Sequence, residues 1–246
     1  MTYDLTRFDV NAVQRCGEGL RHASSTTSSM EAAARAVCRH LYDELAGARG
    51  ERASVLVRCY KTHPFGQLPP DLQRTAKRAL GAVSFSPPDA GMKCLVLLAT
   101  AGDEPAWNDR RTSRGHQAIP LPSPHIVERA PMIAQLIEEL GFDLTQVVRS
   151  GATAMRDLGD RSYGVFHVEH AKGSPYIPAQ DFVDAHAVES VLGFGGGLPD
   201  GDIYAAIIFA RVRIPVASAD RFRALASDLK ACLLRHESTV FDPATT

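Results

Sequence analysis

The chain has 246 residues and a formal net charge of −1, and 45% of its residues are hydrophobic and 22% charged. This composition is typical of a globular domain, and the near-neutral charge argues against a partner that is nucleic acid or an anionic membrane surface. No apolar run approaches the roughly 18 residues of a membrane-spanning helix, and an N-terminus containing acidic residues is unlike a signal peptide.

The cysteines bear on the cellular compartment. There are five, scattered along the chain, and they form no C-x-x-C pair. An odd, scattered set argues for reduced thiols and against both a disulfide framework and a zinc knuckle. We therefore expect a cytoplasmic protein.

The first quarter of the chain is predicted to be helical and then extended. Residues 1–22 show weak helical patterning. Ser28 and Glu31 fit a capping box, and apolar residues at four-residue spacing follow, which predicts a helix over 30–46. The β-branched segment 53–60 predicts a strand.

The middle of the chain mixes loops, helices and strands. We expect, in order, a loop at 61–70, a helix at 71–80, a strand at 93–100, an irregular segment at 101–128, helices at 131–140 and 144–158, a strand at 163–168 and a loop at 172–180. The loop at 61–70 follows from its three prolines, and a continuous apolar run indicates that the strand at 93–100 is buried on both faces. The irregular segment is long for a compact chain, which is typical of a functional or mobile loop.

The stretch 190–212, SVLGFGGGLPDGDIYAAIIFARV, places glycines between two apolar runs. A phosphate-binding loop needs a helix directly after its glycines, and here a run rich in Ile, Ala and Phe follows instead. Residues 199–202, Pro-Asp-Gly-Asp, are typical turn residues. The sequence therefore predicts a β-hairpin of residues 190–195 and 203–214.

Two regions of this pattern resemble GAF domains. Residues 187–210 (AVESVLGFGGGLPDGDIYAAIIFA) and the helix after them are similar to the closing hairpin and last helix of that family. The helix SMEAAARAVCRHLYDEL and the strand ASVLVRCY are similar to its first helix and strand. More narrowly, THPFGQLPPDLQ, LLATAGDEPAWNDRRTSRGHQAIPLPS and GSPYIPAQ resemble a divergent GAF-like sensory region of bacterial signalling proteins. The resemblance implies an α+β fold with a central antiparallel sheet of about five or six strands flanked by helices, as the element order also suggests.

The resemblance also implies a domain organisation and a function. Residues 1–25 would be an N-terminal helical segment, 26–237 a GAF-like sensory domain with an insertion at 101–160, and 238–246 a disordered tail. Such a domain binds a small molecule or an ion and signals through a partner or an output module. No kinase, cyclase or DNA-binding module follows residue 236. We therefore expect the chain to act through a separate partner or to be a segment of a larger signalling protein.

The loop 106–121, AWNDRRTSRGHQAIPL, carries the main candidates for ligand binding. Trp107 offers a large amphipathic ring, three arginines offer forked donors, and His116 titrates near neutral pH. They could bind an anionic or aromatic ligand over the sheet. Alternatively, the loop packs on the core through Trp107 and its charges form a solvated surface. The expected ligand-binding residues are Trp107, Asn108, Arg114, His116, Tyr176 and Phe194.

A second candidate site is the run His167-Val-Glu-His170. In an extended strand His167 and Glu169 share a face, and imidazole and carboxylate groups suit Fe or Zn. His116 or His125 could complete such a site. The other interpretation is a polar strand end in solvent, since no second cluster has ligand spacing. A metal-binding sensor or metalloenzyme centred on His167 and His170 is thus an alternative function, and the sequence identifies no cofactor.

Enzymatic chemistry has little support. Cys59 and Cys94 lie inside apolar strands with no base nearby, and no motif of a nucleophilic serine is present. A further alternative is a dimerisation or scaffold module without a ligand. The amphipathic helix predicted at 218–236 carries an apolar stripe that a second copy would help to cover, so we expect a homodimer.

Overall fold

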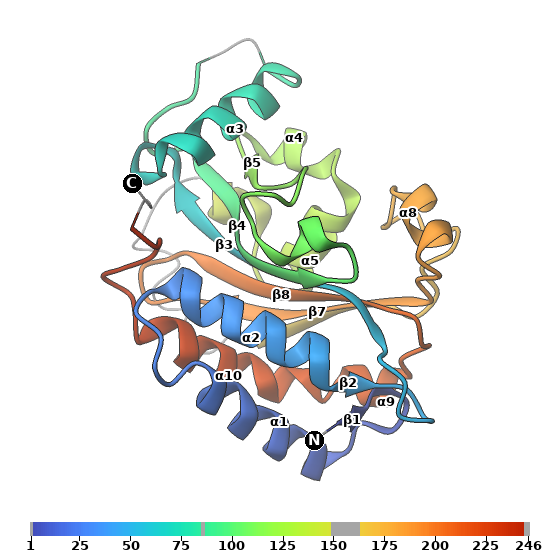
Figure 1. Ribbon diagram of the computed structural model, residues 1–246. Helices are drawn as coiled ribbons and strands as arrows, with labels where there is room; N and C mark the ends of the chain where they lie inside the picture. The colour runs from blue at the N-terminus through green and yellow to red at the C-terminus, as the bar shows by residue number, and fades with distance from the viewer. Residues whose placement is uncertain (1, 85–86, 149–162, 244–246) are drawn as a thin grey trace.

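The computed structural model describes residues 2–84, 87–148 and 163–243. Its centre is a six-stranded antiparallel sheet in the order β5-β4-β3-β8-β7-β6 (Figure 1). The strands are β3 (Ser54–Pro64), β4 (Lys93–Gly102), β5 (Ala118–Pro120), β6 (Tyr163–Val168), β7 (Ser190–Gly197) and β8 (Ile203–Ala210). A separate parallel pair joins β1 (Tyr3–Asp4) to β2 (Leu45–Ala46). The expected α+β class with a central antiparallel sheet flanked by helices is confirmed.

Three long helices cover one face of the sheet (Figure 1). They are α1 (Val10–Ala23), α2 (Met30–Glu44) and α10 (Phe222–Leu234), and the short α9 (Val216–Ala219) precedes α10. Phe222 packs between Phe8, at a ring separation of 4.6 Å, and Phe194 of β7, at 5.4 Å. The apolar stripe predicted for the last helix is fully buried inside the chain by these contacts.

Shorter helices and turns cover the opposite face. They are η3 (Pro105–Asn108), α4 (Pro124–Glu128), α5 (Pro131–Glu139), α6 (Leu144–Val148) and α8 (Gln180–Ala185), with η2 (Phe65–Gln67) and α3 (Pro70–Gly81) beside β5. The end of α5 lies directly on β6. A Cβ added at Gly164 would stand only 2.0 Å from the carbonyl oxygen of Glu139. The glycine thus fixes how closely α5 approaches the sheet.

The hairpin predicted from the glycine-rich stretch is confirmed. β7 pairs with β8 in register from Ser190 and Ala210 to Gly197 and Ile203, and no helix follows the glycines. The turn closes with a 2.7 Å hydrogen bond from the amide of Leu198 to the carbonyl oxygen of Asp202. Gly201 adopts a φ of 82°, a conformation that glycine reaches without strain.

Several element boundaries differ from the expectation. Ser29, one residue after the expected cap, caps α2 by accepting a hydrogen bond from the Ala32 amide at 2.9 Å. β3 continues through Lys61 to Pro64, because this part pairs with β4. The helix α8 was not expected at all, since the prolines before it indicate a loop. Of the helix expected over 144–158, only α6 lies within the described residues.

The segment 238–243, expected as part of a disordered tail, is packed against α2. Its carbonyl oxygens accept hydrogen bonds from the first amides of the helix: Met30 donates to Thr239 and Glu31 to Val240, both at 2.9 Å. The first turn of a helix has no acceptors of its own for these amides, which explains why the segment docks there. Residues 244–246 lie outside the described part of the chain.

Two further features bear on the sequence interpretation. All five cysteines are free and buried, and burial raises the pKa of Cys59 and of Cys94 to about 12, so neither thiol is ionised at neutral pH. Within the described ranges, no helix combines the length and apolar character needed to cross a bilayer.

Candidate functional site

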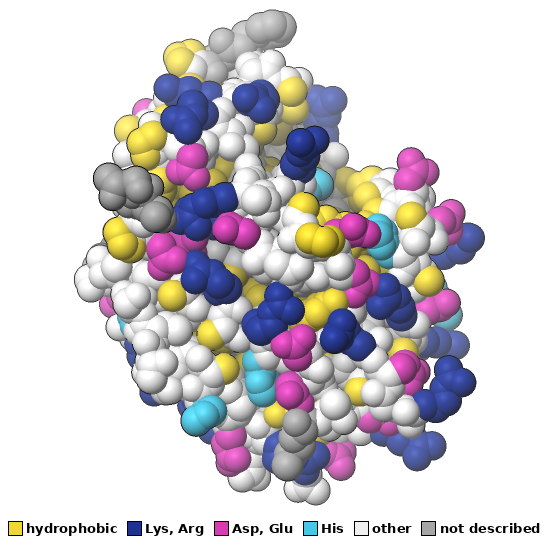
Figure 2. Space-filling view, viewed as in Figure 1, with side chains coloured by type: hydrophobic (Ala, Val, Ile, Leu, Met, Phe, Trp, Pro, Cys, Tyr) yellow, Lys and Arg dark blue, Asp and Glu magenta, His cyan; other side chains and the backbone are white. Residues whose placement is uncertain are grey.

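A cavity of about 350 Å³ lies between the sheet and the helices α5 and α8. Its floor is formed by β3 and β8, one wall by the turn η3 and α8, and the other by α5 and the loop before β5. The residues that line it are mostly apolar: Leu56, Tyr60, Leu95, Trp107, Ile119, Ala130, Met132, Ile133, Leu136, Ile177, Pro178, Ala179, Phe182, Ile207 and Phe209, with Arg58, Arg114 and His116. Figure 2 shows hydrophobic side chains between the α8 region and the rest of the molecule. The volume lies within the range of small-molecule sites.

Aromatic rings form the wall on the α8 side. Trp107, partly buried, meets Phe182 edge-on with 5.7 Å between ring centroids, and lies 4.8 Å from His186. Phe182 in turn meets Phe209 of β8 at 5.3 Å. The wall thus joins α8 to the turn η3 and to the sheet through rigid side chains.

Asn108, the neighbour of Trp107, does not line the cavity. Its side chain accepts a hydrogen bond from the Gly102 amide at 3.1 Å and donates to the carbonyl oxygens of Gly102 and Glu104, both at 3.0 Å. Arg39 of α2 also donates to Asn108. Asn108 therefore holds the turn η3 on the end of β4, which positions Trp107.

Arg114 and His116 stand at the mouth of the cavity. His116 has a φ of 59°, an uncommon conformation for a residue with a side chain. Although the residue keeps contact with solvent, desolvation of its ring and the charge of Arg58 lower the pKa of His116. The imidazole is therefore neutral at pH 7.

Arg58 is a cavity residue that the sequence analysis missed. It lies on the central strand β3, is 9% exposed, and donates to the hydroxyl groups of Tyr60 at 3.3 Å and Ser113 at 3.1 Å. Its Nε is buried without a hydrogen-bond partner. The signal in the sequence is a single arginine inside the apolar run SVLVRCY, since charged residues are almost never buried without a partner.

Tyr176 and Phe194, two expected ligand-binding residues, lie outside the lining. Tyr176 is 39% exposed in the loop before α8, and its neighbour Ile177 faces the cavity instead. Phe194 points to the opposite face of the sheet, where it packs on Phe222. The alternation of side chains along a strand places Phe194 on that face.

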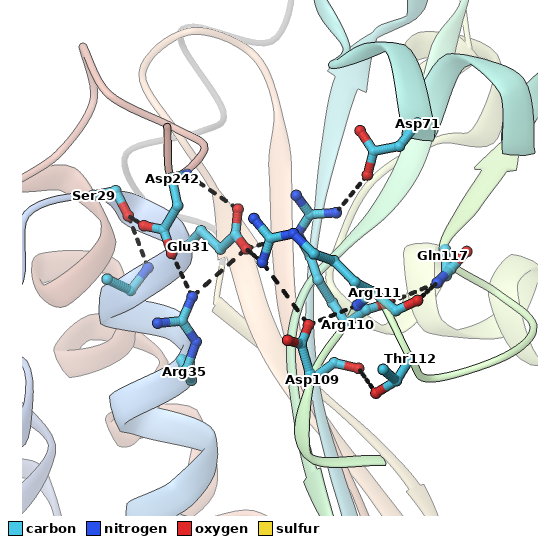
Figure 3. A network of polar contacts seen from close by, with 11 residues as sticks. Ser29, Glu31, Arg35, Asp71, Asp109, Arg110, Arg111, Thr112, Gln117 and Asp242 are labelled. Atoms are coloured by element: carbon cyan, nitrogen blue, oxygen red, sulfur yellow. Dashed lines mark hydrogen bonds and ion pairs between the residues drawn. The ribbon is translucent and has the colours of Figure 1, made fainter. Parts of the chain in front are cut away.

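A network of charged groups anchors the loop that carries Arg114 and His116 (Figure 3). The buried carboxylate of Glu31, at the start of α2, pairs with Arg110 Nε at 2.8 Å and with Arg111 at 3.2 Å. Glu31 also accepts a hydrogen bond from the amide of Asp242 at 3.1 Å, and Asp242 pairs with Arg35 at 2.5 Å. The network thus connects the loop beside the cavity to α2 and to the segment after α10.

The candidate metal residues do not converge on one site within the described part of the chain. Glu169 is engaged by Arg213 Nε at 3.0 Å, and this hydrogen bond lowers the pKa of Glu169. His170 is exposed, and burial lowers the pKa of the half-buried His167. His116 precedes β5, at the opposite edge of the sheet from β6, so it is separated from His167 by the width of the sheet. The described residues contain no group of three or more His, Cys, Asp or Glu side chains arranged to hold a metal ion.

Comparisons with known proteins give low structural likeness. No protein-family model and no curated protein sequence matches the chain. Among solved structures, the N-acylhomoserine lactone dependent LuxR family transcription factor CepR2 from Burkholderia cenocepacia matches with a TM-score of 0.41 at 10% identity, over 92% of this chain and 95% of that one. The phycoerythrobilin-bound GAF domain of a cyanobacterial phytochrome matches with a TM-score of 0.40 at 10% identity, over 92% of this chain and 98% of that one. The photosensory core module of the Stigmatella aurantiaca phytochrome matches with a TM-score of 0.39 at 10% identity, over 93% of this chain and 37% of that one.

Proposed function

We propose that this chain is a sensory or regulatory domain that binds a small molecule in the cavity between the sheet and the helices α5 and α8. The observation that carries the proposal is the cavity itself: a space of about 350 Å³ with apolar walls and a few converging polar groups. That combination is characteristic of small-molecule sites. The free cysteines support a cytoplasmic location.

The signal would pass through the loop between η3 and β5. A ligand in contact with Arg114 and His116 changes the free energy of this loop, and the loop is tied to Glu31 by Arg110 and Arg111. Glu31 in turn binds the segment after α10. We therefore propose that occupancy of the cavity is transmitted to α2 and this segment, where a partner protein or an output module would sense it.

The test is a thermal-shift screen of a small-molecule library on the wild-type chain and on an Ile133→Trp variant, whose larger side chain narrows the cavity. A ligand that binds the native state raises the melting temperature. We expect compounds that raise it for the wild type and not for Ile133→Trp, and that change the fluorescence of Trp107, the single tryptophan. Hits that act equally on both proteins, or no hits, would contradict the proposal.

A further inference from the structure

Arg58 is a buried cation without a counter-ion among the described residues. Its two hydrogen-bond acceptors, the hydroxyl groups of Tyr60 and Ser113, are neutral, and no carboxylate of the described residues forms an ion pair with it. Arginine does not lose its proton in proteins, so the charge cannot be removed by titration. A buried charge is costly unless it is paired, and here the space in front of Arg58 is the cavity.

The mouth of the cavity is also positively charged. A groove of about 780 Å³ adjoins the cavity and shares Arg114, His116, Ile119, Ala130 and Ile133 with it. The groove adds Arg78, Arg129 and Arg111, the last of which is paired with Glu31 and Asp109, and no Asp or Glu occurs among the described residues that line it. A cleft of one sign raises the local concentration of a ligand of the opposite sign. The groove therefore favours the approach of an anion.

The rest of the cavity suits an apolar group. Met132, Ile133 and Leu136 of α5 face the aromatic wall of Trp107 and Phe182 across it. Apart from the indole N–H of Trp107, these side chains offer no N–H or O–H donor and no oxygen acceptor to a sugar, a peptide or a nucleobase, whose polar groups would be desolvated at a cost. An apolar group has no hydrogen bonds with water to lose on entering the cavity, and burial of its surface favours binding.

We propose that the cavity binds an amphipathic organic acid, with its carboxylate on Arg58 and its apolar body between α5 and the aromatic wall. The inference rests on the proposed function, and it adds the class of ligand. Two of the five N–H groups of Arg58 are engaged, one on each terminal nitrogen, so each terminal nitrogen keeps one N–H to donate to a carboxylate. A volume of about 350 Å³ holds about a dozen non-hydrogen atoms if each takes about the 30 Å³ of a water molecule.

The experiment compares acids with neutral molecules of the same shape. Decanoate is titrated against 1-decanol, and 2-naphthoate against 2-naphthamide, by isothermal calorimetry on the wild-type chain. We expect at least one acid to bind about thirtyfold or more tightly than its neutral counterpart, as for the loss of one partner of a buried charge pair. The variant Arg58→Met should lower the affinity for that acid to the neutral level, and Arg49→Met, an exposed arginine outside the cavity, should not.

A stability measurement separates binding from a structural role. If Arg58 is an anion-binding residue that is unpaired in the free protein, Arg58→Met removes an unpaired buried charge. The variant then unfolds at the same urea concentration as the wild type or at a higher one. Equal affinity for acid and neutral probe, unchanged acid binding by Arg58→Met, or no binding of either acid would overturn the inference. The comparison of acid with neutral molecule uses only the wild-type chain, so it tests the inference even if Arg58→Met does not fold. A neutral probe that binds and changes Trp107 fluorescence would leave the proposed function intact while excluding the acid.

Discussion

Asp202, at the end of the hairpin turn, binds two lysines in the interior of the sheet. Lys61, 1% exposed, and Lys93 both pair with its carboxylate, and Thr62 donates to it at 3.0 Å. Burial alone would raise the pKa of Asp202, but the two ammonium groups outweigh burial and lower it. The carboxylate is therefore held ionised, and its charge is what permits Lys61 to be buried.

We expect Asp202→Asn to destabilise the protein by about 3–5 kcal/mol, because among the described residues it leaves Lys61 with the exposed Asp200 as its one carboxylate partner, beside the carbonyl oxygen of Thr62. Since the folded pKa is lowered, this stabilisation is present above the unfolded pKa of about 3.9 and is lost as the pH falls through the folded value. Urea unfolding of both proteins at about pH 7 and about pH 3 measures the difference. Asp200→Asn is the control, and an equal effect of the two variants would refute the account.

His116 gives a pH dependence of ligand binding. Its pKa is lowered in the free protein by desolvation and by Arg58, and a bound carboxylate would raise it again, because an anion favours the imidazolium ion. The affinity for an acid should therefore increase as the pH falls from about 7.5 to about 5.5. Calorimetry in two buffers of different ionisation enthalpy measures the proton uptake, and His116→Gln should abolish it; uptake that persists in this variant would exclude His116 as its source.

At the scale of elements, Glu31 connects the loop beside the cavity to α2 and to the C-terminal segment. We expect Glu31→Gln to cost about 3 kcal/mol, because it removes the buried carboxylate shared by Arg110 and Arg111 and leaves the buried Arg110 paired with the exposed Asp71. Hydrogen exchange should rise together in the loop 109–117 and the segment 239–243. Asp109→Asn, which loses only an exposed pair of 3.8 Å with Arg111, is the control. Unchanged exchange in 239–243 would contradict the connection.

Elements with a clear period or a local turn signal could be predicted, and those that depend on distant partners could not. The helix α2, the strand β4 and the hairpin follow from apolar spacing and from the Asp-Gly turn. The strand β5 has three residues and exists only because β4 offers it an edge to pair with. The six-residue helix α8 packs through Phe182 on Trp107, which lies far from it in the sequence. Local patterns carry no information about such contacts.

For the whole molecule, the structure removes the reason for expecting a dimer through α10. Phe222, Leu225, Leu229 and Leu233 are buried by α1, α2 and the sheet, so the stripe offers no apolar surface to a second copy. The homodimer stays a prediction that rests on the resemblance alone, and light scattering at micromolar concentration measures it. A mass near one chain would exclude it. We expect Leu229→Glu to unfold the chain in either case, by placing an unpaired charge in the core; a folded variant would contradict this burial.

The sequence by itself determined the fold class, the hairpin, the apolar stripe of the last helix and the candidate loop with Trp107, Arg114 and His116. Periodicity and turn residues are local properties of the sequence, so these features can be predicted without knowledge of distant contacts. Only the tertiary structure decided which side chains share the cavity. It added Arg58 from the centre of the sheet and Phe182 from α8, and it turned Phe194 to the other face. Residues that are distant in the chain meet there because sheet order and helix packing bring them together, and no pattern along the sequence encodes that meeting.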